Sequence, residues 1–231
     1  MKPAELKTLL ADSGQTYSEL LDIDLSKGAD GEVFKWFLAF ILFGAPITEN
    51  SVIKTYRVFE KRGILTPQKI VKTGWDGIVK VLDKGSYTRY DFKTASKLLL
   101  VIGNLLEKYD GSLNRIHDEA EDPRDLELKL KGLGKGIGSV TVGIFLRELR
   151  GVWKKADPVP TELVIKAAVN LGLIKKGSTP VEALEQLKSC WSKNRVRGMS
   201  FVNLEAALVR VGKGLRAKKR RGSVAVRGVE G

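Results

Sequence analysis

The segment Gly136-Ile137-Gly138-Ser139-Val140-Thr141-Val142 places a glycine–apolar–glycine turn directly before a predicted apolar helix. The first backbone N–H groups of a helix have no partner within that helix, and the helix dipole adds positive charge at the same end. Because glycine has no Cβ, an anion can come close to this backbone. We therefore interpret the turn as a candidate phosphate-binding site.

The residues before this turn make it part of a helical hairpin. Residues 126–150 predict a helix, a tight glycine turn and a second helix, with Lys131 and Lys135 flanking the turn. The glycines alternate with other residues, at Gly132, Gly134, Gly136 and Gly138. An ordinary connection with a glycine helix cap has the same pattern, and the two lysines favour the phosphate interpretation.

The rest of the chain is also predicted to be helical, because glycines and prolines divide it into apolar or amphipathic pieces of helix length. The predicted all-α fold has two helical lobes with a cleft between them. Residues 31–120 form one lobe, residues 1–30 and 121–212 form the other, and residues 213–231 form a basic disordered tail. The helices are expected at residues 3–21, 31–44, 50–62, from 66, 75–82, 90–109, 113–120, 122–130, 161–171, 180–190 and 200–211.

The composition favours a polyanion as partner. Forty Lys and Arg residues stand against 27 Asp and Glu residues, which gives a formal net charge of +13. Such an excess is typical of nucleic-acid-binding proteins, although a thermophile's charged surface also fits. One cysteine and one histidine exclude an intrachain disulfide, a thiolate zinc site and an iron–sulfur cluster. No apolar run is long enough to span a bilayer, so we expect a soluble intracellular protein.

The hairpin resembles the motif of the helix-hairpin-helix/Gly-Pro-Asp superfamily of DNA base-excision glycosylases, and in particular the endonuclease III group. Gly136, Ile137, Gly138 and Thr141 match its Gly-Val-Gly-x-x-Thr pattern. Asp157 matches the acid that follows, 157 − 140 = 17 residues beyond the position before Thr141. Residues 37–49 resemble the family's opening helix and loop, and the resemblance extends over about residues 31–212.

The resemblance implies that the protein cleaves the N-glycosidic bond of a damaged or deaminated base that is flipped out of duplex DNA. Asp157 is then the catalytic carboxylate, which stabilises the positive charge that develops on the sugar. The two lobes would enclose a DNA-binding cleft. The predicted DNA-binding residues are Lys131, Gly134, Lys135, Gly136, Gly138 and Thr141; Pro46 and Ile47 are the predicted DNA wedge; and Trp36, Tyr87, Tyr90 and Trp153 are the candidates for the base pocket.

Two departures from the family pattern narrow the prediction. Members that also cut the strand carry a lysine directly before the threonine, where this chain has Val140. A second register, which matches Gly132 and Gly134 to the motif, places Gly136 there instead, so neither register supplies the lysine. We therefore predict a monofunctional, monomeric glycosylase without iron–sulfur cluster or other cofactor. The sequence leaves open whether the backbone carbonyls of the hairpin bind a monovalent cation.

Three alternatives remain at this point. A glycosylase with lyase activity would use Lys135 or another lysine outside the usual position. A non-catalytic helix-hairpin-helix protein would bind duplex DNA without releasing a base. A helical protein–protein adaptor is the weakest alternative, because it leaves the net charge and the glycine turn without a role.

Overall fold

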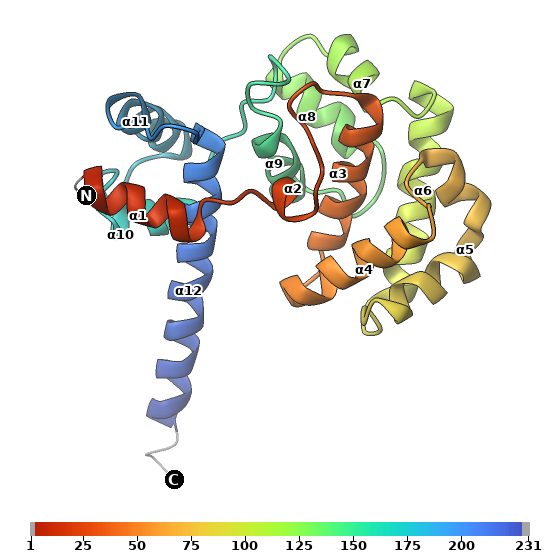
Figure 1. Ribbon diagram of the computed structural model, residues 1–231, viewed down its shortest axis with the longest axis horizontal. Coiled ribbons are helices and arrows are strands. Elements are labelled where there is room, and N and C mark those ends of the chain that lie inside the picture. The colour runs from red at the N-terminus through yellow and green to blue at the C-terminus, as the bar shows by residue number, and fades with distance from the viewer. Residues whose placement is uncertain (1–2, 228–231) are drawn as a thin grey trace. The chain divides into compact units, whose positions relative to one another are not determined.

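The computed structural model describes residues 3–227, with side chains for residues 4–217 (Figure 1). Every regular element within that range is an α-helix, which confirms the predicted all-α class. The described helices are α1 (Pro3–Ser13), α2 (Tyr17–Leu20), α3 (Asp30–Phe43), α4 (Glu49–Lys61), α5 (Pro67–Lys84), α6 (Asp91–Tyr109), α7 (Leu113–Glu119), α8 (Pro123–Lys131), α9 (Ser139–Glu148), α10 (Glu162–Asn170), α11 (Pro180–Lys193) and α12 (Phe201–Arg227).

The helices form two compact units whose boundaries differ from the predicted lobes. The larger unit is Ser18–Pro158, and the smaller is Met1–Tyr17 with Val159–Gly231. The predicted division at residues 30 and 120 is therefore wrong, because helices α8 and α9 belong with α3 to α7. The aromatic rings explain this placement: Phe145 lies 5.4 Å from Phe37 and 5.1 Å from Phe40, measured between ring centroids.

Helix α3 is the central element of the larger unit. It contacts α4, α6, α7 and α9, which surround it in Figure 1. Its residues Val33–Leu42 are all buried apart from Lys35, as its nearly continuous apolar sequence predicts. Burial of this helix on most sides removes a large apolar area from water and holds the surrounding helices in register.

Helices α5 and α6 pack side by side along the edge of the larger unit. Helix α5 combines the two helices predicted from residues 66 and 75, and it is kinked at Gly74, whose φ of 68° and ψ of 175° are not helical. The polar end of Trp75 lies just beyond the kink, and its Nε1–H donates to Ser96 Oγ on α6 at 3.0 Å.

The smaller unit consists of α1, α10, α11 and α12. Asn203 Nδ2 on α12 donates to the carbonyl of Gly14 at 2.9 Å. Gly14 also ends α1, so the single helix predicted for residues 3–21 is broken into α1 and α2. Helix α12 continues to Arg227, which corrects the predicted disorder for residues 213–227; residues 228–231 of that tail lie outside the described residues.

Candidate nucleic-acid interface

The predicted hairpin is present as α8, a turn over residues 132–138, and α9. The turn is anchored from inside by Leu133 and Ile137, which are 0% and 5% exposed. Asn104 Nδ2 on α6 donates to the carbonyl of Leu133 at 2.8 Å. Gly136 has a φ of +95°, in the region that favours glycine. The turn therefore has a defined conformation set by burial and by its glycine.

The N-terminus of α9 is open to a ligand. Gly138 is the N-cap residue, and it has no side chain that could bond to the first N–H groups of the helix. Gly138, Ser139 and Val140 are exposed, and Thr141 is half-buried. This geometry is what phosphate binding at a helix N-terminus requires. The start of α9 directly after Gly138 agrees with the alignment in which Gly136 and Gly138 match the two glycines of the motif.

Asp157 lies on the segment between α9 and α10 and is held by an arginine. Arg150 forms an ion pair with Asp157 Oδ1 and also donates to the carbonyl of Pro158. The Arg150 side chain is 8% exposed and the Asp157 side chain 41% exposed. A nearly buried guanidinium that bonds to both residues fixes the orientation of a carboxylate that solvent and ligands still reach.

Asp157 does not cap the following helix. Helix α10 begins at Glu162 with Thr161 as its N-cap residue, so Asp157 precedes the helix by more than one turn. The N-terminus of α10 therefore gives this carboxylate little support, because the field of a helix end fades within the first turn. Arg150 supplies the positive charge instead.

Helix α9 brings the predicted DNA-contacting segments together within the larger unit. A Cβ added at Gly44, in the loop after α3, would lie 3.5 Å from Thr141 Cγ2. A Cβ added at Gly143 would lie 4.0 Å from Pro158 Cβ, next to Asp157. The loop with the predicted wedge, the hairpin and the Asp157 segment thus meet along one helix. In that loop Pro46 is exposed and Ile47 half-buried, and their wedge role stays a prediction.

Two of the candidates for a base pocket are core residues. Trp36 is fully buried, and its Nε1–H donates to the carbonyl of Phe145 at 3.1 Å. Tyr87 is 1% exposed, its hydroxyl donates to the carbonyl of Leu42 at 2.6 Å, and burial raises its pKa to about 12. The predicted pocket role is wrong for both, because neither ring presents a face to a ligand.

Trp153 is also buried in the core, whereas Tyr90 is only half-buried. The Trp153 ring is 3% exposed and stacks on His117, with 5.0 Å between the ring centroids. Its Nε1–H donates to Asn114 Oδ1 at 2.7 Å, so it too serves the core rather than a pocket. Tyr90 is half-buried and lines a cavity, and its binding role stays a prediction.

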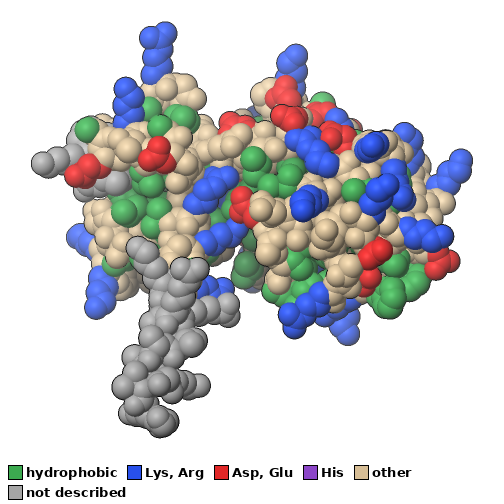
Figure 2. All heavy atoms as spheres, turned by 60° about the horizontal axis from the view of Figure 1, so that its bottom comes forward, with side chains coloured by type: hydrophobic (Ala, Val, Ile, Leu, Met, Phe, Trp, Pro, Cys, Tyr) green, Lys and Arg blue, Asp and Glu red, His purple; other side chains and the backbone are tan. Residues whose placement is uncertain are grey.

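That cavity contains two lysines that the sequence analysis missed. Its volume is about 690 Å³, and Lys93 and Lys97 of α6 line it together with the hairpin residues Lys135 and Gly136. We call it the lysine cavity. In the sequence, the four-residue spacing of Lys93 and Lys97 indicates that both lie on one face of a helix. Figure 2 shows Lys and Arg side chains spread over the visible face of the larger unit, with fewer acidic ones.

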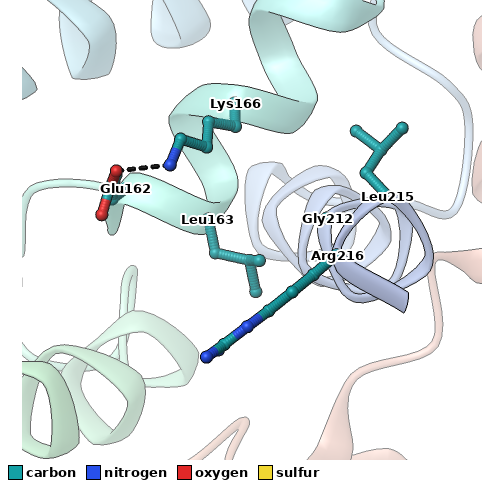
Figure 3. Close-up of a pocket in the computed structure, with 6 residues that line it drawn as sticks. All are labelled: Glu162, Leu163, Lys166, Gly212, Leu215 and Arg216. Atoms are coloured by element: carbon teal, nitrogen blue, oxygen red, sulfur yellow. Dashed lines mark hydrogen bonds and ion pairs between the residues drawn. The ribbon is translucent and has the colours of Figure 1, made fainter. Parts of the chain in front are cut away.

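A second cavity, of about 410 Å³, lies between α10 and α12 in the smaller unit (Figure 3). Here Lys166 Nζ pairs with Glu162 Oε1 at 2.5 Å, and Arg216 extends beside Leu163. This α10–α12 cavity thus contains an acid among its basic groups. Among the described residues, no group of three or more His, Cys, Asp or Glu side chains is arranged to hold a metal ion.

No family model and no curated protein matches this sequence. Among solved structures, the chain is similar to a 3-methyladenine DNA glycosylase from H. pylori bound to 1,N6-ethenoadenine. The TM-score is 0.52 at 16% sequence identity, and the match covers 93% of this chain and 97% of the other. At this identity the likeness shows a shared all-helical fold, and it gives no support for the narrower endonuclease III group. None of the helices described here has the length and apolar character needed to cross a membrane.

Proposed function

We propose that this protein is a DNA N-glycosylase that removes a damaged base from duplex DNA. One observation carries the proposal. The hairpin, whose helix N-terminus is open, and Asp157, an oriented and accessible carboxylate, meet along α9 in one compact unit. The likeness to a glycosylase fold over nearly the whole chain supports it. The solved neighbour makes 3-methyladenine and 1,N6-ethenoadenine the first lesions to test.

The proposed reaction divides the work between these elements. The hairpin binds a backbone phosphate and fixes the register of the strand, while the target nucleotide is flipped out of the stack. Loss of the base leaves positive charge on the sugar. The Asp157 carboxylate stabilises this charge and orients a water molecule for attack on C1′. Arg150 positions the carboxylate and is not itself in the reaction.

The same geometry favours a monofunctional enzyme. Val140 occupies the position before Thr141 and is 64% exposed in the first turn of α9, so no amine stands there to attack the sugar. Lyase activity would then require another lysine, and trapping with borohydride would reveal the covalent adduct. The proposed partner is lesion-containing duplex DNA, which a monomer binds without a cofactor. The proposal includes one optional ion, a monovalent cation at the backbone carbonyls of the hairpin.

The test is a base-release assay on a panel of duplexes with one lesion each, with and without hot alkali. We expect strand breaks only after alkali. The variant Asp157→Asn should reduce the rate of base release by about 10²- to 10⁴-fold, because it removes a charge aimed at the transition state. The matched control is Asp76→Asn, an exposed acid of α5 that should leave the rate unchanged.

The outcomes separate the alternatives. Full activity of Asp157→Asn would refute the assigned role. Salt-sensitive duplex binding with no base release for any lesion would leave a non-catalytic DNA-binding protein as the explanation. Breaks without alkali would show that a lysine acts as nucleophile.

A further inference from the structure

The lysine cavity is formed by three segments that are distant in sequence. Helix α6 contributes Lys93 and Lys97 from its first half, the loop after α3 contributes Gly44 to Pro46, and the hairpin turn contributes Lys135 and Gly136. A volume of about 690 Å³ is within the range of small-ligand sites and is large enough for a nucleotide. The complete lining is Gly44, Ala45, Pro46, Tyr90, Lys93, Thr94, Ser96, Lys97, Leu100, Lys135 and Gly136.

The charges in this cavity are of one sign. Three lysines and no acidic residue line it, and no ion pair to Lys93, Lys97 or Lys135 occurs among the described residues. Like charges that converge on one hollow repel one another, and this repulsion is greater where the walls exclude water. An anion bound between the lysines would replace the repulsion with attraction.

Lys97 is the member of this set that is held in place. A Cβ added at Gly136 would lie 3.3 Å from Lys97 Cδ, so the aliphatic stem of the lysine lies against the glycine of the hairpin turn. Burial, and in second place the charge of Lys93, lowers the pKa of Lys97. The ammonium group is therefore both desolvated and positioned, whereas Lys93 and Lys135 are exposed and can adjust to a ligand.

The rest of the lining selects the kind of anion. Ala45, Pro46 and Leu100 give the cavity apolar walls. Ser96 is engaged elsewhere, because its hydroxyl accepts from Trp75 and donates to the carbonyl of Phe92 at 3.0 Å. A phosphate joined to a sugar fits this combination, because the ammonium groups contact the phosphate while the sugar lies against apolar side chains.

We propose that the lysine cavity binds a backbone phosphodiester of DNA, with its deoxyribose, as a second phosphate site beside the N-terminus of α9. The proposal rests on the proposed function only in taking DNA as the source of the phosphate. Lys97 is the central contact, Lys93 and Lys135 add charge from either side, and the loop after α3 lies against the sugar.

The test measures the affinity for an undamaged duplex by fluorescence anisotropy at several salt concentrations. Lys97→Gln should weaken binding by about 10-fold at low salt and reduce the slope of log affinity against log salt by about 0.9, the value for one phosphate contact. Lys97→Arg should restore both. The matched control is Lys108→Gln: Lys108 is exposed near the other end of α6, about 16 Å along the helix axis, and should change neither.

The result that overturns the proposal is an equal salt slope for Lys97→Gln, Lys108→Gln and the unchanged protein. Competition with inorganic phosphate distinguishes a site for free phosphate, which would be blocked at millimolar concentrations, from a site that needs the polymer. Failure of the proposed function would look different: duplex binding with the predicted slopes, but no base release from any lesion. Thermal unfolding of each variant shows whether a loss of affinity reflects a loss of fold.

Discussion

Two cavities among the described residues, one in each unit, contain similar basic groups in opposite surroundings. The lysine cavity of the larger unit has three lysines and no acid, whereas the α10–α12 cavity has Lys166 and Arg216 with Glu162 among its lining residues. Lys166 forms an ion pair with Glu162, which also holds the pKa of that carboxyl below its usual value. Net charge alone therefore does not identify a phosphate site. What identifies one is a group of cations with no acid to satisfy them.

The difference extends to other surfaces of the larger unit. Arg57 pairs with Asp22 and Glu60, and Arg115 pairs with Asp110 and Glu119. Exposed pairs of this kind add little to stability, but they cancel the field that would attract a polyanion. Arg57 and Arg115 are therefore weaker candidates for a phosphate contact than the lysines of the lysine cavity.

Charge reversal should separate the two cavities most clearly. Lys135→Glu removes a cation next to the phosphate and adds a repulsive charge, so we expect duplex affinity to fall by about 100-fold at low salt. Lys166→Glu should cost much less, because Glu162 already offsets that charge. Anisotropy titrations of both variants in parallel make the comparison. Equal losses would mean that the protein responds only to total charge.

Exchange of glycine for alanine tests the geometry of the lysine cavity rather than its charge. Gly136→Ala should destabilise the fold by about 1–2 kcal/mol, because alanine is strained at a φ of +95° and its Cβ would crowd Lys97. Gly103→Ala is the control: Gly103 is helical in α6 with no atom near an added Cβ, so the fold should gain about 0.5–1 kcal/mol. Urea unfolding measures both. A gain for Gly136→Ala would show that the turn does not need its glycine.

The hairpin, the helices and the position of Asp157 follow from local sequence. The sequence predicts a helix at residues 90–109, and α6 is found at Asp91–Tyr109, because its apolar period is encoded within a few residues. Gly138 at the start of α9 is predictable for the same reason. Basic residues among glycines and small residues predict disorder beyond residue 212, yet α12 continues to Arg227, because Lys, Arg and Ala favour helix.

The boundaries of the two units and the base-pocket residues could not be derived in this way. Whether Trp36 or Tyr87 lies in a pocket or in the core depends on Phe145 and Leu42, which are distant in the sequence. The same holds for Lys97, whose contact with Gly136 spans 39 positions, 136 − 97. Residue type and spacing show which groups can do chemistry, and tertiary packing decides which of them a ligand reaches.

The pH dependence of DNA binding should sharpen the role assigned to Lys97. The groups around its ammonium in the cavity are Lys93 of the same helix, Lys135 of the hairpin and Tyr90. The pKa of Lys97 is lowered in the free protein, and a bound phosphate raises it, so binding takes up a proton. Affinity should therefore fall as pH rises through the lowered pKa, in a pH range below the ordinary pKa of a lysine.

Lys97→Arg provides the control for this dependence, because arginine stays protonated over that range. We expect its affinity to fall less steeply with pH than that of the unchanged protein, in anisotropy titrations at constant ionic strength. Identical pH profiles would show that Lys97 does not contact the phosphate, even if its replacement by glutamine weakens binding.

The smallest effect is expected where the α10–α12 cavity is made to resemble the lysine cavity. Glu162→Gln removes the acid that pairs with Lys166 and leaves Lys166 and Arg216 without it. Both partners are exposed, with side-chain exposures of 81% and 68%, so the pair is weak and unfolding should hardly change. Duplex affinity should rise by about twofold at low salt, and the rise should vanish at high salt, where exposed charges are screened. A larger gain that persists in salt would mean that removal of an acid is enough to create a phosphate site. A small and screened gain would mean that the site also needs a desolvated cation held against the backbone, as Lys97 is held against Gly136.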